Sequence, residues 1–177
     1  MLVAMRSHTA LFPAFALLLL AALLCACVAV MPGAAAARPH AHLEGSRAVA
    51  PKHAPPAVKR MIAAANHIWH RPYRWGGGHS QWNSKGYDCS GSVSYVLHKA
   101  GLLDYPLASG DLAKWGKKGP NRWVNIWANK DHVFMYIAGL RWDTSYITDG
   151  DRSGPGWSEL KRPSRGFKLR HPAGINH

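Results

Sequence analysis

Hydrophobic residues first recur at helical spacing between residues 58 and 69, where they fall on one face of an α-helix. Pro55 and Pro56 supply a start signal, and we expect this helix to end near Arg71. Its apolar face consists of Val58, Met61, Ile62, Ala65, Ile68 and Trp69. A helix with one apolar face of this kind packs that face against a core.

The same spacing returns over residues 93–100, and Gly101 ends it. This pattern predicts a second, buried helix. Asp88 precedes it and suits the N-cap, because its carboxylate can accept from the first free backbone N–H groups. A glycine-rich stretch and a polar loop, residues 73–87, lead into this helix start. A short helix is expected around residues 111–115.

Beyond residue 120 the hydrophobic period changes to two, which indicates β-strands. Residues 124–128 and 132–137 alternate apolar and polar side chains, and a turn at Gly139-Leu140 leads into residues 141–145. A polar loop then precedes a last strand near residues 167–170. Two helices followed by a meander of short strands predict an α+β fold, with the helices packed on one face of an antiparallel sheet.

The first 37 residues have a different character. A short start with a single arginine, an apolar middle and a small-residue end predict a secretory signal peptide over residues 1–37. The alternatives are an uncleaved membrane anchor and a lipoprotein, with lipidation at Cys27. Residues 38–56 contain four prolines and predict a disordered basic linker. We expect residues 57–177 to form one compact domain.

The chain is strongly basic. Its formal charge of +13 falls to +12 when residues 1–37, with one arginine and no acidic residue, are removed. Such a charge favours polyanions. For an exported protein we expect anionic wall polymers as partners, no nucleic acid and, after signal cleavage, no membrane. The expected location is secreted, in the cell wall or periplasm.

Cysteine usage leaves one thiol for chemistry. Cys25 and Cys27 lie in the expected signal peptide, so Cys89 is alone in the mature chain and cannot form an internal disulfide. It is either a buried bystander or a nucleophile. Its position at a helix start favours the nucleophile, because unpaired N–H groups and the helix dipole stabilise a thiolate. Asp88 opposes this by its like charge, so a histidine partner is expected.

Among the histidines, His132 suits the role of base. It opens an apolar strand, where its backbone is held rigidly while its ring remains at the sheet edge. A cysteine at a helix start facing a histidine on a packed sheet forms a thiol–imidazole pair. His79 and His171 remain the alternatives on this reasoning.

Three segments together resemble the NlpC-type family of papain-like cell-wall peptidases. They are residues 73–77 (Tyr-Arg-Trp-Gly-Gly), residues 87–93 (Tyr-Asp-Cys-Ser-Gly-Ser-Val), and His132-Val133 opening an apolar strand. The resemblance runs from about Ile62 to Ser145, and less clearly to Ile175. It implies a papain-like α+β fold.

The resemblance also implies a reaction. Cys89 would attack a peptide carbonyl, and His132 would activate the thiol and protonate the leaving amine. The implied substrate is the stem peptide of peptidoglycan, with the bond between D-glutamate and the diamino acid favoured. Asp88 and Ser90 are implied near a substrate amine, with Tyr73 lining the site. Backbone N–H groups at the helix start would meet the oxyanion.

This chain departs from the family pattern in two places. Asp131 and Phe134 stand where glycine is common in the family. The polar residue that orients the base falls on Thr144 by ungapped counting, whereas the expected hairpin places Asp143 on the face of His132. Asp143 is chemically the better partner for an imidazole N–H, and both residues remain candidates.

No cofactor or metal is expected. The glycine run, residues 76–78, lacks the Lys-Ser/Thr sequel of a phosphate loop, and His67 and His70 lack further ligands at zinc-site spacing. Two other functions stay open: an amidase or acyltransferase that uses the same Cys–His pair, and a catalytically weak wall-binding module.

Overall fold

The computed structural model describes residues 40–148 and 151–175. The expected signal peptide, with its alternatives at residues 1–37, and the first two residues of the expected linker lie outside this part. Within the described residues, no helix is both long and apolar enough to cross a membrane.

Helices form where the apolar spacing predicted them. Helix α2 spans Pro56–Ile68 and begins with proline in its first turn, where a missing N–H costs nothing. Helix α3 spans Cys89–Lys99, and the Asp88 carboxylate accepts from the backbone N–H of Gly91 as its N-cap. Helix α4 is short, Ser109–Leu112, slightly before its expected position.

The strands form one six-stranded antiparallel sheet in the order β3-β8-β4-β5-β6-β7. Their bounds are Lys117–Lys118 for β3, Val124–Ala128 for β4, Val133–Ile137 for β5, Leu140–Asp143 for β6, Gly156–Ser158 for β7 and Lys168–His171 for β8. The chain order is therefore not a simple meander, because the last strand pairs with β4. Strands β3 and β7 lack the length for a visible period of two.

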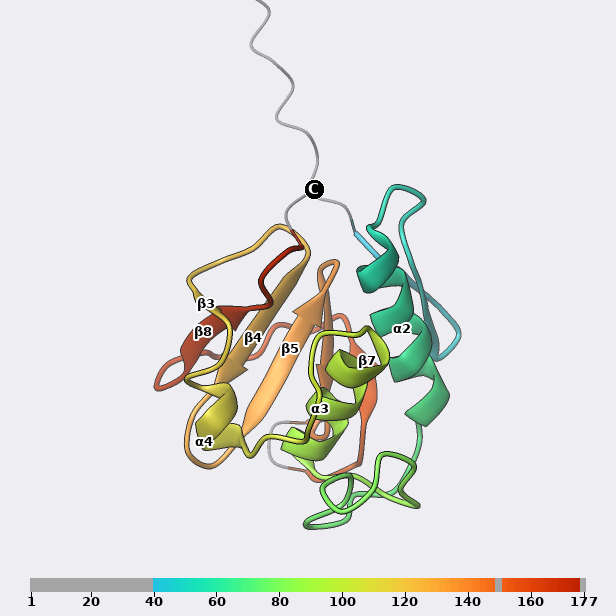
Figure 1. Ribbon diagram of the computed structural model, residues 1–177. Helices are drawn as coiled ribbons and strands as arrows, with labels where there is room; N and C mark the ends of the chain where they lie inside the picture. The colour runs from blue at the N-terminus through green and yellow to red at the C-terminus, as the bar shows by residue number, and fades with distance from the viewer. Residues whose placement is uncertain (1–39, 149–150, 176–177) are drawn as a thin grey trace, which may run out of the picture. The chain divides into compact units, whose positions relative to one another are not determined.

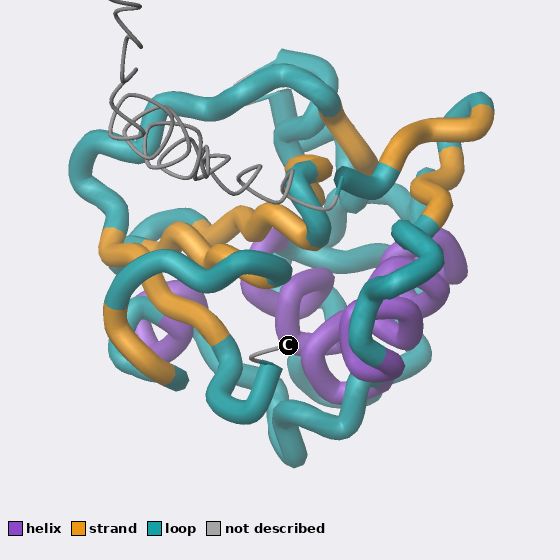
Figure 2. The backbone as a smooth tube through the Cα atoms, turned by 90° about the horizontal axis from the view of Figure 1, so that it is seen from above, coloured by secondary structure: helices purple, strands orange, loops and turns teal. Residues whose placement is uncertain are grey.

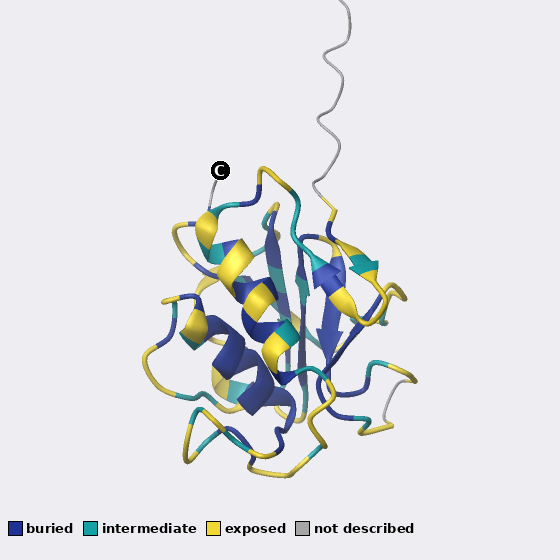
Figure 3. Cartoon of the chain, turned by 90° about the vertical axis from the view of Figure 1, so that its right-hand side faces the viewer, coloured by how far each residue is buried: buried dark blue, intermediate teal, exposed yellow. Residues whose placement is uncertain are grey.

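The helices lie on one side of this sheet (Figures 1 and 2). Alternate residues of β5, namely Val133, Met135 and Ile137, are fully buried in the core between the layers. Figure 3 shows α2 with a buried face and an exposed stripe, whereas α3 is buried along most of its length. The predicted α+β fold is confirmed.

The predicted disordered linker is wrong for residues 40–55. A hairpin of β1, His42–Glu44, and β2, Arg47–Val49, occupies this stretch. The Asn66 side chain of α2 bonds both the N–H and the carbonyl of Ala48, at 3.0 and 2.8 Å. Ala41 donates to the Ala138 carbonyl at 2.8 Å. Small alanines bury here without a hydrophobic period, so composition alone suggested a linker.

The turn between β5 and β6 lies one residue earlier than predicted. Ile137 pairs with Leu140, so Ala138 and Gly139 form the turn, with φ of 47° and 90°. Both central residues therefore have the positive φ of a type I′ hairpin turn. This register places Asp143 one position beyond the Met135–Trp142 pair, opposite Phe134. The predicted face of Asp143 is unchanged, because the shift moves its opposite position by two residues.

Candidate active site

Cys89 is the first residue of α3, directly after its N-cap. An amide at a helix start has no partner within the helix, so its N–H is free to bind a negative charge. The residue is largely buried, with 8% of its surface exposed. The thiol therefore sits at the end of a helix, at the edge of the core, and not in the middle of the apolar packing.

His132 lies immediately before β5, and its Nε2 is 3.0 Å from Oδ1 of Asp143. Burial lowers the pKa of His132, but the interactions with Asp143 and with the Cys89 side chain outweigh burial and raise it to about 9. At neutral pH the ring is therefore an imidazolium beside the thiol, ready to give a proton.

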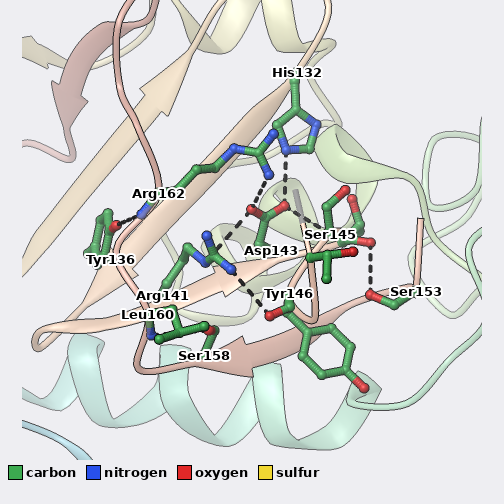
Figure 4. Close-up of polar contacts among 12 residues, drawn as sticks. His132, Tyr136, Arg141, Asp143, Ser145, Tyr146, Ser153, Ser158, Leu160 and Arg162 are labelled. Carbon is green, nitrogen blue, oxygen red and sulfur yellow. Dashed lines mark hydrogen bonds and ion pairs between the residues drawn. The ribbon is translucent and has the colours of Figure 1, made fainter. Parts of the chain in front are cut away.

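Asp143 closes β6 and its side chain is fully buried. Oδ1 accepts from His132 and from the Ser145 backbone N–H, and Oδ2 accepts from Nη1 of Arg162 at 3.0 Å. Figure 4 shows these groups converging on the carboxylate, with Arg141 below it. Burial works to raise the pKa of Asp143, but His132 and Arg162 hold it below its usual range. A buried carboxylate needs such partners to remain charged.

Thr144, the alternative to Asp143, does not contact the base in this arrangement. Its hydroxyl is buried, and no hydrogen-bond partner for it exists among residues 40–148 and 151–175. Its carbonyl accepts from Gly154 and Ser153 in the following loop. The geometry therefore favours Asp143 as the residue that orients His132.

Phe134, one of the two departures from the family pattern, backs this site. The side chain is fully buried, and its ring centroid lies 5.1 Å from that of Phe167 and 6.3 Å from that of His132. The Arg162 guanidinium lies 5.4 Å from the Phe134 ring. The aromatic residue thus supplies packing for the base and for the arginine. Asp131, the other departure, is exposed and pairs with Lys130.

A second imidazole–carboxylate pair adjoins Cys89. His79 Nε2 lies 3.1 Å from Oδ1 of Asp88 and 3.1 Å from Oγ of Ser90. Asp88 also accepts from the backbone N–H groups of Gly76 and Gly91. The hydrogen bond to Asp88 raises the pKa of His79. His79, an alternative base from the sequence, therefore interacts with the N-cap carboxylate.

Tyr73 belongs to the same neighbourhood. Burial raises the pKa of its hydroxyl, and the negative charges of Cys89 and Asp88 raise it further. The structure places Tyr73 against Tyr87, two residues before Cys89, and Asp88 and Ser90 flank Cys89 in the chain. His171, the remaining alternative base, is elsewhere, since its Nδ1 bonds the Gly119 carbonyl at the β3–β8 edge.

Sequence reasoning did not single out Arg162. It lies in an irregular segment between β7 and β8, with no motif around it, and only the tertiary fold brings it to Asp143. A lone arginine in a basic chain carries no signal of its own. Its backbone N–H donates to the Tyr136 hydroxyl at 3.0 Å, which fixes the segment against β5.

Two hollows on the surface of the described residues are lined by neither Cys89 nor His132. They share His67 and Asn83, and both are lined by basic side chains and no acidic one. The further basic residues are Arg60 and Lys99 in one, and Arg71 and Lys85 in the other. Within the described chain, no three His, Cys, Asp or Glu side chains cluster as metal ligands.

This chain is similar to known bacterial proteins, although no family model matches it. It is 36% identical over 127 residues to the peptidoglycan endopeptidase RipB of Mycobacterium tuberculosis, a match covering 67% of this chain and 51% of the relative. The chain thus spans about half the length of the curated relatives it matches.

Two solved structures resemble the fold. The peptidoglycan hydrolase RipB from Mycobacterium tuberculosis matches with a TM-score of 0.50 and 28% identity, covering 65% of this chain and 64% of that one. An NlpC/P60 family protein from Bacillus cereus matches with a TM-score of 0.50 and 22% identity, covering 66% of this chain and 40% of the other. The second likeness speaks for the fold alone.

Proposed function

We propose that this chain carries a domain of the NlpC/P60 family and is a cysteine endopeptidase that hydrolyses peptide bonds in peptidoglycan stem peptides. The bond between D-glutamate and the diamino acid is the favoured target. The relative RipB is a peptidoglycan endopeptidase, and this chain has the thiol, base and carboxylate that such a reaction requires. The protein is then exported, since its substrate lies outside the cytoplasm.

The observation that carries the proposal is the charge arrangement at Cys89. His132 is hydrogen-bonded to the buried Asp143 carboxylate, and Cys89 is near enough to contribute to the raised pKa of the imidazole. Nε2 is engaged by Asp143, which leaves Nδ1 for the sulfur. An imidazolium beside a thiolate is the activated form of a cysteine nucleophile. A bystander cysteine has no need of a base oriented by a buried carboxylate.

In the first half of the reaction the Cys89 sulfur attacks the peptide carbonyl carbon. The oxygen becomes an oxyanion, which accepts from the backbone N–H of Cys89 at the helix start. The imidazolium of His132 then gives its Nδ1 proton to the nitrogen of the scissile bond. That C–N bond breaks, the amine leaves, and a thioester remains on Cys89.

In the second half, neutral His132 accepts a proton from a water molecule as the water oxygen attacks the thioester. The C–S bond breaks, the carboxylic acid product leaves, and the thiolate–imidazolium pair is restored. Asp143 does not exchange protons. It holds the ring orientation and stabilises the imidazolium, because its carboxylate is buried 3.0 Å from Nε2.

We assign Tyr73, Asp88 and Ser90 to the substrate side of the site. The pKa of Tyr73 is raised by burial and then by Cys89 and Asp88, which supports its proximity to both. Asp88 already accepts four hydrogen bonds, from Gly76, Gly91, Ser90 and His79. The oxygens of Asp88 are therefore already occupied. Ser90 and His79, which Asp88 holds in place, are the groups that face the substrate.

The deciding experiment is cleavage of purified muropeptides followed by mass spectrometry. Cys89→Ser should abolish product formation, because a neutral hydroxyl is a far weaker nucleophile beside this imidazolium. Its circular dichroism spectrum should match that of the wild type. Cleavage retained by Cys89→Ser would remove the thiol from the mechanism, and the product masses identify the broken bond.

Two alternatives are separated by further measurements. An amidase or acyltransferase would use the same thiol, but it would release a different product in the same assay. A wall-binding module would show slow iodoacetamide labelling of Cys89 that is unaffected by His132→Ala. We expect fast labelling that depends on His132, since the imidazolium stabilises the thiolate.

Anionic wall polymers are proposed as a second partner of the basic surface. The two hollows lined by Arg60, Lys99, Arg71 and Lys85 are supporting features, because no acidic side chain lines them. Attraction between exposed charges is screened by salt. Binding to cell walls should therefore weaken between 0.05 and 0.5 M salt, at roughly the concentrations where screening becomes short-ranged. Salt-insensitive binding would reject this partner.

A further inference from the structure

Trp75 is an exposed indole on the turn that packs against the start of α3. It is 82% exposed, whereas Trp123, Trp142 and Trp157 are each at most 4% exposed. A fully exposed tryptophan is unusual, because this side chain usually buries most of its large apolar surface. Trp75 is also absent from the residues that pack against the core. Packing against the core therefore does not explain why a tryptophan stands at this position.

The backbone on both sides of Trp75 is fixed. Arg74 donates to the Tyr87 carbonyl at 3.1 Å, and Gly77 donates to the Arg74 carbonyl at 2.9 Å. Gly76 donates to Oδ2 of Asp88 at 2.9 Å. These bonds tie the turn to the two residues that precede Cys89. The indole is thus presented by a rigid turn, and it is not on a loose loop.

Glycine packing adds a second constraint on the same turn. A Cβ at Gly77 would collide with the Gly86 carbonyl oxygen, and one at Gly91 would collide with the Gly77 carbonyl oxygen. Gly91 lies in the first turn of α3, two residues after Cys89. The turn that carries Trp75 therefore lies against the start of the catalytic helix, with no room for adjustment.

We propose that Trp75 is a binding platform for a pyranose ring of the glycan strand, so that the enzyme takes stem peptides still attached to their sugars. This inference rests on the proposed function for the identity of the ligand. One face of a pyranose ring consists of C–H groups, and the negative face of an indole attracts such weakly positive hydrogens. A rigid indole pays little conformational entropy when a sugar stacks on it.

The distance along the chain fits this assignment. Trp75 is bonded to Gly76, and Asp88 is bonded to Cys89, while Gly76 and Asp88 share the 2.9 Å hydrogen bond. The backbone at Trp75 therefore lies close to the residues that precede Cys89. A glycan-linked stem peptide could place its peptide bond at Cys89 and its sugar at Trp75. An apolar peptide side chain is the competing occupant, and it predicts a different experimental result.

Direct binding is tested without cleavage in Cys89→Ala protein. The probe is a peptide-free tetrasaccharide of alternating N-acetylglucosamine and N-acetylmuramic acid. In 15N-labelled protein, the indole N–H resonance that disappears in Trp75→Phe identifies Trp75. We expect that resonance to shift on titration with the probe, and the shifts to persist in Tyr105→Ala, a matched control at another exposed aromatic residue. An unmoved Trp75 resonance at millimolar probe would overturn the proposal.

Cleavage then tests whether the contact serves catalysis. Two substrates are compared, one stem peptide free and the same peptide attached to a disaccharide. Trp75→Ala should lower kcat/KM for the sugar-linked substrate by roughly three- to tenfold, the size of one aromatic contact, and leave the free peptide unchanged. Trp75→Phe should recover part of the loss. Equal losses on both substrates would assign Trp75 to the peptide, contrary to the proposal.

These outcomes are distinct from failure of the proposed function. If the wild type cleaves neither substrate, the peptidase proposal fails while the resonance titration still decides the sugar site. A circular dichroism spectrum and an unfolding curve of Trp75→Ala separate lost binding from lost folding. Tyr105→Ala should leave kcat/KM at the wild-type value for both the free and the sugar-linked peptide.

Discussion

Two imidazole–carboxylate pairs lie next to Cys89, and their distances are almost equal. His132 Nε2 is 3.0 Å from Asp143, and His79 Nε2 is 3.1 Å from Asp88. The surroundings differ. The other partners of Asp143 include the Arg162 side chain, and Cys89 is among the groups that raise the pKa of His132. His79 shares a single nitrogen between Asp88 and Ser90.

The difference teaches what separates a base from a structural histidine. Two of the four hydrogen bonds that Asp88 accepts come from backbone N–H groups, at the start of α3 and in the turn at Gly76. Much of its charge therefore acts on the backbone of the helix N-terminus. Among the described contacts, Asp143 accepts from the Ser145 backbone N–H and from the side chains of His132 and Arg162, so its charge acts mainly on the imidazole and the guanidinium. The distance between imidazole and carboxylate therefore does not identify the base. The other group near each imidazole does, which is the thiol for His132 and Ser90 for His79.

The sharpest test of this comparison removes each imidazole in turn. His132→Ala should lower kcat/KM for muropeptide cleavage by roughly 10²- to 10⁴-fold, the usual contribution of general acid–base catalysis. His79→Ala should lower it by less than about tenfold, because His79 has no hydrogen bond to the thiol among the described contacts. The rate of iodoacetamide labelling should follow the same ranking. Equal losses in the two variants would erase the distinction.

Replacing the carboxylate beside the base should have the next largest effect. Asp143→Asn removes the charge that raises the pKa of His132 to about 9. The pKa of the imidazole then falls, the imidazolium is lost at lower pH, and the basic limb of the kcat profile moves down. We expect turnover to drop roughly 10²-fold or more, because the neutral amide does not stabilise the imidazolium.

Thr144→Val is the matched control for Asp143→Asn. Its hydroxyl is buried without a partner in the described part of the chain, so removing it should leave turnover and the pH limb near the wild type. Because Cys89 and His132 interact strongly, the limb reports the pair and not one residue. A larger loss in Thr144→Val than in Asp143→Asn would transfer the orienting role to Thr144.

The sequence predicted what depends on local spacing. Helices α2 and α3 and strands β4 and β5 follow from runs of apolar residues with clear periods, and the N-cap role of Asp88 follows from its position. The His132–Cys89 contact was predicted from a helix start and a strand start. The residues alone ranked His132 first and left His79 and His171 open, and the family resemblance decided among them, because spacing alone does not bring distant elements together.

What the sequence missed depends on tertiary contacts. Strand β7 has three residues, and the pairing of β8 with β4 joins segments about 40 residues apart, so neither leaves a local period. Asp143 was placed on the correct face with the turn misplaced by one residue, because a one-residue shift of a hairpin turn moves the pairing by two. Arg162 reaches Asp143 across 19 residues of chain.

Replacing Arg162 should lower turnover less than Asp143→Asn does and should shift the basic limb of the pH profile in the opposite direction. Its guanidinium and the His132 imidazole both contact the Asp143 carboxylate. Burial raises the pKa of Asp143, and the interactions with His132 and Arg162 lower it. In Arg162→Gln, a nearby positive charge is lost, so the imidazolium is favoured and the basic limb should move to higher pH. Turnover should fall by roughly tenfold or less, as Asp143 loses one of its anchors.

Lys161→Gln is the control for charge alone, since it removes the same charge from the exposed neighbouring residue. Its pH profile should overlay that of the wild type, because exposed charges are screened. If both variants shift the limb equally, the effect is a general one of net charge. If Arg162→Gln moves the limb downward, as Asp143→Asn does, then Arg162 supports the imidazolium only through the position of Asp143.

Changes to the His79–Asp88 pair should affect the free energy of unfolding more than the rate of cleavage. Asp88→Ala removes an N-cap, which costs about 1–2 kcal/mol of unfolding free energy. The pKa of Asp88 is held below its ordinary 3.8, so its contribution is present above that pH and is lost as pH falls. The pKa of His79 is raised above 6.5, so the coupled part is present below that pH and is lost as pH rises.

The difference in unfolding free energy between wild type and Asp88→Ala should therefore be largest between about pH 4 and 6.5. Urea unfolding at one pH inside that window and one on each side measures it. When both proteins also carry His79→Ala, the difference in unfolding free energy should no longer decline above about pH 6.5. It should still decline below about pH 4, because the backbone N–H groups still bind the Asp88 carboxylate. A difference that does not vary with pH would mean that Asp88 caps the helix without an ionised pair, and the contrast with Asp143 would then rest on hydrogen bonds alone.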